Sequence, residues 1–506
     1  MPTLLLVEDD PDQLEIRSLI LSQAGHEVFG APSCAEALHL ARLHQPALVV
    51  MDLRLPRSAD GLALIAELRA LVPSPRIVVL SGWTADLVPH PDVDAVLAKP
   101  VHTPELIKLV ARLSAMLLLL LLPLTAAVIQ LDKPAEVIAE IATPISDWQT
   151  QPRIADLLLN GQPKLQLPLV ASRQTVFLGR LPAGRHELTL PHSTITLTPT
   201  TDPVHLHAPV LYERKNAIGK FTDIPLLTYA EQLTENGQKV LAYSVIFSNE
   251  DGGTSTRFLM ARWGRSTDIE FVYRVFLRPD GTREKAIIQA RGHKEILFTG
   301  PYENDHPLLI PVTDNNMVAG EGPSAVRYQP AAVKVDLATA SRESVMDQAP
   351  FTWQAMSKEL LRENKLRPYG VERGEDISDP RNYLFLEFAV KNYRSRVAAM
   401  VRLKGQSRWF TSHFGVPDAA IDRDGWVRTT IELPPGTTQH EVAELAIQCL
   451  AAERAKQLGT CEIPAITKTF FLKSNMLPAK SFFSSAPNSP VTLRVGEVWS
   501  WTLNSK

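Results

Sequence analysis

Two stretches decide the fold of the first part of the chain: LLLVEDDP at residues 4–11 and VVMDLRLP at residues 49–56. Each contains a short apolar run that ends in acidic residues. Segments with apolar residues at helical spacing, such as residues 14–25 and 61–72, separate these runs from similar ones further along. Apolar strands that alternate with helices are typical of a parallel sheet covered on both faces. We therefore expect a doubly wound α/β domain with five parallel strands over residues 1–113.

Charged and hydroxyl side chains follow the expected strands at the point where each strand ends. In a parallel sheet these ends meet at one edge, where functional groups gather. Clustered carboxylates repel each other, and Mg²⁺ is a cation that such oxygen ligands suit. An aspartate beside Mg²⁺ can attack phosphorus, and a lysine and a hydroxyl can contact the transferred group. The residues in question are Glu8, Asp9 and Asp10 after the first strand, Asp52 after the third, Ser81 after the fourth and Lys99 after the fifth.

Four motifs, in order, give residues 3–113 a family resemblance. They are LLLVEDDP, VVMDLRLP, VVLSG and LAKP. Together they resemble the receiver domain of bacterial response regulators, which has a flavodoxin-like fold. The resemblance implies that Asp52 accepts a phosphoryl group from a sensor histidine kinase or phosphotransfer protein. It implies only phosphoacceptor and autodephosphorylation chemistry, so whether the chain is an enzyme stays open.

The same resemblance assigns roles to the neighbouring residues. Glu8, Asp9 and Asp52 would hold Mg²⁺ together with the backbone carbonyl of Arg54. Ser81 and Lys99 would contact the phosphoryl group, and the Lys99–Pro100 peptide bond would be cis. Asp10 is expected to be a loop or helix-cap residue rather than a ligand.

The sequence departs from the family pattern on the face that usually signals outward. Few residues separate Ser81 from Lys99, so the fourth helix is expected to be short or absent. Val96 stands where many receivers carry Tyr or Phe, and Asp60–Gly61 lies one residue later than usual. The phosphorylation chemistry is therefore better supported than the usual conformational readout.

An uncharged stretch, LSAMLLLLLLPLTAAVIQL, occupies residues 113–131. Its length predicts a single apolar helix that could span a membrane, with residues 114–131 joining a cytoplasmic receiver to an extracytoplasmic remainder. Met116, six leucines and the small residues after Pro123 fit a secretory signal peptide equally well. A buried core helix is a third interpretation. The first two both predict that the following residues are exported.

The remainder, residues 132–506, reads as mostly β. We expect a small sandwich over residues 132–210 and a β-rich region of two subdomains over residues 211–506. Turns at Asp251–Gly–Gly and Pro279–Asp–Gly predict two long hairpins. One amphipathic helix is expected at residues 440–458. Cys449 and Cys461 are close enough in sequence to form a disulfide in an oxidising compartment.

Composition excludes some classes of function. The net charge of −3 gives no reason to expect a nucleic-acid partner, and no DNA-reading helix, phosphate loop or zinc-protease motif occurs. Residues 1–113 carry nine basic and 14 acidic residues, so the acidic character is concentrated there.

Residues 132–506 offer only weak candidates for a site. We consider an acid/base or metal cluster, a loop resembling a calcium site and an aromatic face for carbohydrate, although solvated charges and core tryptophans explain the same patterns. The residues are His293, Glu295, Glu303, Asp305 and His306 for the first, Asp418, Asp422 and Asp424 for the second, and Trp263, Trp353, Trp409 and Trp426 for the third.

The leading hypothesis is therefore a phosphorelay receiver joined to an exported β-rich region of unknown ligand. A second hypothesis is that a stand-alone receiver and a separate secreted protein have been joined by gene fusion or a reading error. A third places the main activity in residues 132–506, as extracytoplasmic glycan binding or hydrolysis.

Overall fold

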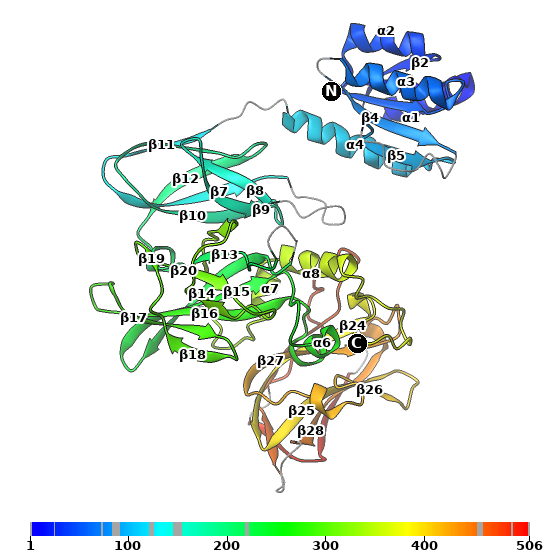
Figure 1. Ribbon diagram of the computed structural model, residues 1–506. Helices are drawn as coiled ribbons and strands as arrows, with labels where there is room; N and C mark the ends of the chain where they lie inside the picture. The colour runs from blue at the N-terminus through cyan, green and yellow to red at the C-terminus, as the bar shows by residue number, and fades with distance from the viewer. Residues whose placement is uncertain are drawn as a thin grey trace. The chain divides into compact units, whose positions relative to one another are not determined.

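The computed structural model forms two compact units, Met1–Thr125 and Ala126–Lys506, which Figure 1 colours from blue to red along the chain. Each unit is considered by itself. The residues that the structure describes are 3–24, 26–71, 74–82, 92–120, 126–144, 154–217, 222–452, 459–486 and 489–503.

The first unit is a five-stranded parallel sheet in the order β2-β1-β3-β4-β5. Its elements are β1 (Thr3–Val7), α1 (Pro11–Gln23), β2 (Glu27–Ala31), α2 (Cys34–His44), β3 (Leu48–Asp52), α3 (Ser58–Arg69), β4 (Arg76–Ser81), β5 (Ala95–Ala98) and α4 (Thr103–Leu120). Residues of α2 and α3 pack on one face of the sheet, and residues of α1 and α4 pack on the other. The expected doubly wound fold is confirmed.

Local sequence explains how the loops at the functional edge are held. Asp10 caps α1 by accepting hydrogen bonds from the backbone N–H groups of Asp12 (3.0 Å) and Gln13 (3.2 Å). Gly61, in α3, lies so close to the loop after β3 that a Cβ atom would overlap the carbonyl of Leu53. Only glycine fits there, which explains the glycine of the Asp60–Gly61 pair noted in the sequence.

The expected single helix over residues 113–131 is wrong. Helix α4 ends at Leu120, and β6 (Ala127–Leu131) is a strand paired with β11. The side chains of β6 alternate, since Val128 is exposed while Leu131 is buried in a sandwich core, and this is a strand period rather than a helical one. Among the described residues, no helix is both long and apolar enough to cross a membrane.

The second unit begins with a small β-sandwich. Its two sheets, in the orders β10-β7-β12 and β6-β11-β8-β9, enclose one apolar core. The strands are β6, β7 (Ala135–Ala142), β8 (Ile154–Leu159), β9 (Gln162–Pro168), β10 (Arg173–Leu181), β11 (Gly184–Thr189) and β12 (Thr194–Thr200).

A six-stranded sheet, in the order β18-β17-β16-β15-β14-β23, forms the middle of the second unit. The elements of this region are α5 (Pro203–Leu206), β13 (Val210–Tyr212), β14 (Pro225–Glu235), β15 (Gln238–Phe247), α6 (Thr256–Trp263), β16 (Asp268–Leu277), β17 (Arg283–Ala290), β18 (Lys294–Leu297), β19 (Tyr302–Glu303), β20 (His306–Pro311), β21 (Val318–Ala319), β22 (Arg327–Tyr328), β23 (Val333–Val335), α7 (Ser344–Gln348) and α8 (Phe351–Arg362). The hairpin expected at Pro279 is confirmed as β16–β17. The one expected at Asp251 is wrong, because α6 follows that turn.

The last part is a second sandwich, with one core between sheets β27-β24-β29-β31 and β26-β25-β28-β32. Its strands are β24 (Tyr383–Tyr393), β25 (Ser395–Leu403), β26 (Trp409–Thr411), β27 (Gly425–Glu432), β28 (Val442–Ala451), β29 (Thr460–Ile463), β30 (Ile466–Phe470), β31 (Val491–Arg494) and β32 (Val498–Thr502). The expectation of a mostly β region is confirmed. The helix expected at residues 440–458 is wrong where it is described, because its Ala- and Leu-rich residues pair along β25 as strand β28.

A disulfide joins Cys449 of β28 to Cys461 of β29, whose Cα atoms lie 5.8 Å apart. The bond links the two sheets of the last sandwich, and both cysteines are fully buried. The pairing considered from the sequence is thus present in the structure.

Reduction of this disulfide should destabilise the second unit by about 3 kcal/mol, the loop-closure entropy of a loop of this length. The measurement is urea unfolding with and without a reductant, followed by the fluorescence of buried tryptophans such as Trp353. Cys34→Ser, which alters the free thiol of the first unit, is the control and should leave the effect of the reductant unchanged. An unfolding midpoint that does not respond to reductant would contradict the bond.

Candidate functional site

The parallel sheet brings the predicted site residues of the first unit to one edge. Glu8 directly follows β1, Asp52 ends β3, Ser81 ends β4 and Lys99 directly follows β5. The backbone N–H of Lys99 donates to the carbonyl of Ser81 at 2.7 Å, which extends the pairing of β4 with β5 to this edge. Four chain segments therefore meet here, as the strand order requires.

Lys99 is the cation that ties the acidic side chains together. Its Nζ lies 2.6 Å from Asp52 Oδ2 and 3.3 Å from Glu8 Oε2. Asp52 also accepts a hydrogen bond through Oδ1 from the backbone N–H of Arg54, at 3.2 Å. Charge-assisted hydrogen bonds of this kind fix the carboxylate of Asp52 in one orientation, with its oxygens facing the site.

Three carboxylates at this edge fit a hard divalent cation. Ligand oxygens of Glu8, Asp9 and Asp52 all lie within 4.8 Å of one another. Glu8 is buried and Asp9 is exposed, so the cluster is open on one side to water, which Mg²⁺ retains when it binds to proteins. Arg54 lies in the loop after β3, and the role of its carbonyl as a ligand stays a prediction.

Arg17 is a part of the site that sequence reasoning missed. Its guanidinium, projecting from α1, forms an ion pair with Glu8 Oε2, and both side chains are largely buried. The helical spacing of α1 shows only that Arg17 lies on a turn of helix, and nothing in the sequence says that this turn faces the first strand end. Arg17 and Lys99 thus share one oxygen of Glu8.

A cavity of about 530 Å³ opens over these residues, lined by α1, the strand ends and the start of α4. Asp10 lines it but serves as the cap of α1, as expected. The Lys99–Pro100 bond is cis, also as expected. Val96 lies in β5, partly buried against the core. The expectation that the fourth helix is short or absent concerns residues 83–91, which lie outside the described residues.

Comparison with known proteins identifies this unit. Residues 4–111 match the family described as the response regulator receiver domain. The first unit of this chain is a response regulator receiver domain. Receiver domains of this family take part in two-component signal transduction, so the recognition from four sequence motifs is confirmed.

Several relatives of this receiver can be named. It is 36% identical over 102 residues to the transcriptional regulatory protein GlrR of Escherichia coli, covering 19% of this chain and 23% of that protein. It is 32% identical over 113 residues to an uncharacterized 14.6 kDa protein of Leptolyngbya boryana, covering 21% of this chain and 86% of that protein. This chain therefore spans less than a quarter of the length of GlrR.

This chain is also similar to solved structures. A putative response regulator from Chloroflexus aurantiacus shares 30% identity, over 22% of this chain and 98% of that one, with a TM-score of 0.21.

The acid/base and calcium candidates of the second unit do not form the sites considered from the sequence, whereas Trp263 and Trp426 line one cavity together. His306 is buried against Phe177, Glu303 pairs with Lys164 and Arg327, and Glu295 pairs with Arg274. The three aspartates considered for calcium binding also have separate partners. Asp418 pairs with Arg396, Asp422 with Arg262, and Asp424 accepts from the backbone of Asn392. Within the described residues, the only group with metal-ligand geometry is the receiver's.

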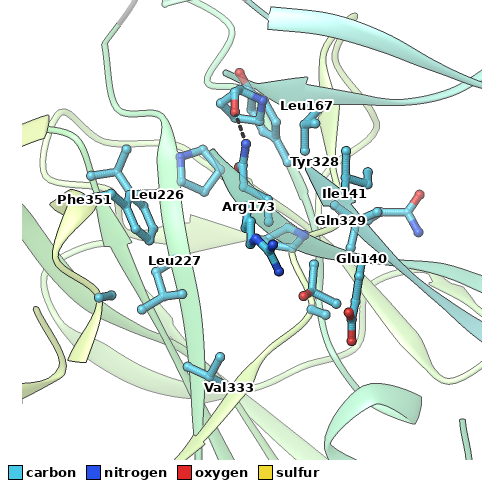
Figure 2. A pocket seen from close by; sticks show the side chains of 18 of the residues that line it. Glu140, Ile141, Leu167, Arg173, Leu226, Leu227, Tyr328, Gln329, Val333 and Phe351 are labelled. Carbon is cyan, nitrogen blue, oxygen red and sulfur yellow. Dashed lines mark hydrogen bonds between the residues drawn. The ribbon is translucent and has the colours of Figure 1, made fainter. Parts of the chain in front are cut away.

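The second unit does contain cavities. One, of about 630 Å³, lies where β7 and β10 approach β14 and the start of α8. Figure 2 shows Leu226, Leu227 and Phe351 on one side of it and Glu140 on the other, with Arg173 between them. Its lining offers a mainly apolar surface with few groups able to move a proton. In a second cavity, of about 540 Å³, half of the lining residues are charged.

Replacement of Arg17 by glutamine should tighten Mg²⁺ binding by about fivefold, because a unit charge a few ångströms from the metal contributes about 1 kcal/mol in a solvated site. Isothermal titration with Mg²⁺ measures this. Arg42→Gln, an exposed arginine on α2, is the matched control and should have no effect. Weaker binding in Arg17→Gln would mean that the arginine orients Glu8 rather than competing with the metal.

Proposed function

We propose that the receiver is phosphorylated on Asp52 by a sensor histidine kinase or a phosphotransfer protein. The observation that carries this proposal is the contact of 2.6 Å between Lys99 Nζ and Asp52 Oδ2 inside a cluster of metal-binding carboxylates. One oxygen of the Asp52 carboxylate is paired with the Lys99 ammonium group. The same carboxylate lies beside Glu8 and Asp9, with which it could bind a metal cation. This combination suits attack on a negatively charged phosphoryl group.

In the proposed step, an oxygen of Asp52 attacks phosphorus and forms an acyl phosphate. The bond from phosphorus to the donor's histidine nitrogen breaks, and that nitrogen keeps the electron pair. Mg²⁺, held by Glu8, Asp9, Asp52 and the carbonyl of Arg54, would neutralise the charge on the phosphoryl oxygens when bound. Lys99 exchanges its contact with Asp52 for one with the phosphoryl group, and Ser81 donates a hydrogen bond to it.

Asp52→Asn should abolish labelling of the full chain by acetyl phosphate in Mg²⁺ buffer, because the amide cannot form the acyl phosphate. Phosphate-affinity electrophoresis measures the label. Asp10→Asn is the matched control, since Asn caps a helix about as well as Asp and Asp10 is not expected to bind the metal. Label that persists in Asp52→Asn would sink the assignment.

We further propose that residues 126–506 act outside the cytoplasm, while the receiver acts inside it. Two observations support this. The disulfide between Cys449 and Cys461 is typical of an oxidising compartment. The second unit begins at Ala126, directly after the apolar run that starts at Met116 and resembles an export signal.

Immunoblots with one antibody against each unit test whether the two parts are separate molecules. Separate translation predicts two shorter species, with the second unit alone in the exported fraction. One species near 56.0 kDa that reacts with both antibodies would contradict it.

A further inference from the structure

The charged cavity of the second unit is built by segments that are far apart in the sequence. We call it the β16 cavity, because Asp268 and Glu270 of strand β16 form one wall. The other walls come from the loop after β15, the end of α6, the segment before α7 and the start of β27. Its volume, about 540 Å³, lies in the range of small-molecule sites.

The acidic wall is organised by hydrogen bonds. Asp268 and Glu270 are two residues apart on one strand, so their side chains share a face. Asn316 donates to Asp268 Oδ2 at 3.0 Å, and Gln289 donates to Glu270 Oε2 at 2.6 Å. Burial raises the pKa of Glu270 to about 8, with Asp268 adding to the effect. At neutral pH this wall therefore carries less negative charge than its composition implies.

The cavity also contains positive charge. Three arginines line it: Arg265, Arg342 and Arg423. Arg423 is the unusual one. Its Nη1 and Nη2 atoms are buried and have no hydrogen-bond partner. Burial, with the nearby arginines, lowers the pKa of Arg423. A buried guanidinium without acceptors is costly, so these donors favour a ligand that supplies acceptor oxygens.

Other buried arginines of this unit donate to carboxylates of the protein itself. Arg428 donates to Asp347 at 2.9 and 2.7 Å and to Glu387 at 2.8 Å. Arg214 pairs with three aspartates in the same way. Arg423 differs from these two arginines, because Glu343 offsets part of its charge but accepts no hydrogen bond from its Nη atoms.

Two aromatic side chains complete the cavity. Trp263 and Trp426 are both partly exposed, and the guanidinium of Arg423 lies 5.1 Å from the centre of the Trp263 ring. His293 lines the cavity with Asn315 and Gln289, which contact its two ring nitrogens at 3.4 and 3.2 Å. Flat aromatic faces beside several hydrogen-bonding groups suit a ring that carries hydroxyls.

We propose that the β16 cavity binds a carboxylate-bearing sugar of the uronate class. Arg423 pairs with the carboxylate through its Nη atoms, and the two tryptophans pack against the sugar ring. Gln289, His293 and Asn315 contact the hydroxyls. Glu270 is largely uncharged below its pKa of about 8, which reduces its repulsion of the ligand carboxylate. Glu343 keeps its charge, because the surrounding arginines outweigh burial and lower its pKa.

Isothermal titration of the full chain with D-glucuronate and D-galacturonate tests this proposal. D-glucose and acetate are the matched probes, since each lacks one half of the ligand. We expect saturable binding of at least one uronate and about tenfold weaker binding of both matched probes. Equal binding of glucose overturns the role of Arg423, equal binding of acetate overturns the sugar, and no binding of either uronate overturns the whole proposal.

Arg423→Gln should remove the preference for uronate over glucose. Arg408→Gln, an exposed arginine of the same unit outside the cavity, is the control and should keep it. An unchanged preference in a folded Arg423→Gln variant contradicts the proposal.

The pH dependence of the unsubstituted chain gives a second readout that requires no variant. The charged groups that act on Glu270 are Asp268, Arg342 and Arg265. The same cavity is also lined by Glu250, whose pKa burial raises to about 7, and by His293, Glu343, Arg423 and Asp424. Glu270 gains its charge as the pH rises through about 8, so uronate affinity should fall several-fold between about pH 7.5 and pH 9. Affinity that is constant or rises over this range contradicts the proposed arrangement.

Discussion

Repulsion between carboxylates is the constraint on which the receiver's functional edge depends. Three acidic side chains meet within a few ångströms because the strands that carry them are parallel and adjacent. Without compensation this arrangement would be unfavourable. Lys99 and Arg17 supply it by pairing with Asp52 and Glu8, and both cations come from segments outside the strands that carry the acids. The sheet sets the positions of the carboxylates, and the two cations allow them to remain there.

The second unit neutralises two of its buried guanidinium groups by the same rule, and it treats a third differently. Arg428 and Arg214 are surrounded by carboxylates, so each buried guanidinium is neutralised within the fold. Arg423 has Glu343 nearby but lacks hydrogen-bond acceptors. Arg428 lies only five residues further along the chain than Arg423. The fold supplies acceptors for the guanidinium of Arg428, whereas the Nη atoms of Arg423, which lines the β16 cavity, have none.

Much of the first unit could be predicted from the sequence, because each strand is a short apolar run and each strand end carries a distinctive side chain. The positions of Asp52, Ser81 and Lys99 follow from that pattern. The ion pair of Arg17 could not be predicted, since it depends on how α1 is rotated against the sheet. In the second unit, residues 442–451 have helix-forming composition but lie in a strand, because pairing with β25 and burial in the sandwich outweigh local propensity. The β16 cavity was also hidden, although Trp263 and Trp426 had been noted, because its walls come from segments more than 150 residues apart.

The close contact of Gly61 with the carbonyl of Leu53 couples two parts of the receiver mechanically. The loop after Asp52 rests directly on helix α3, with no side chain between them to absorb a shift. A displacement of that loop would therefore meet the backbone of α3 directly.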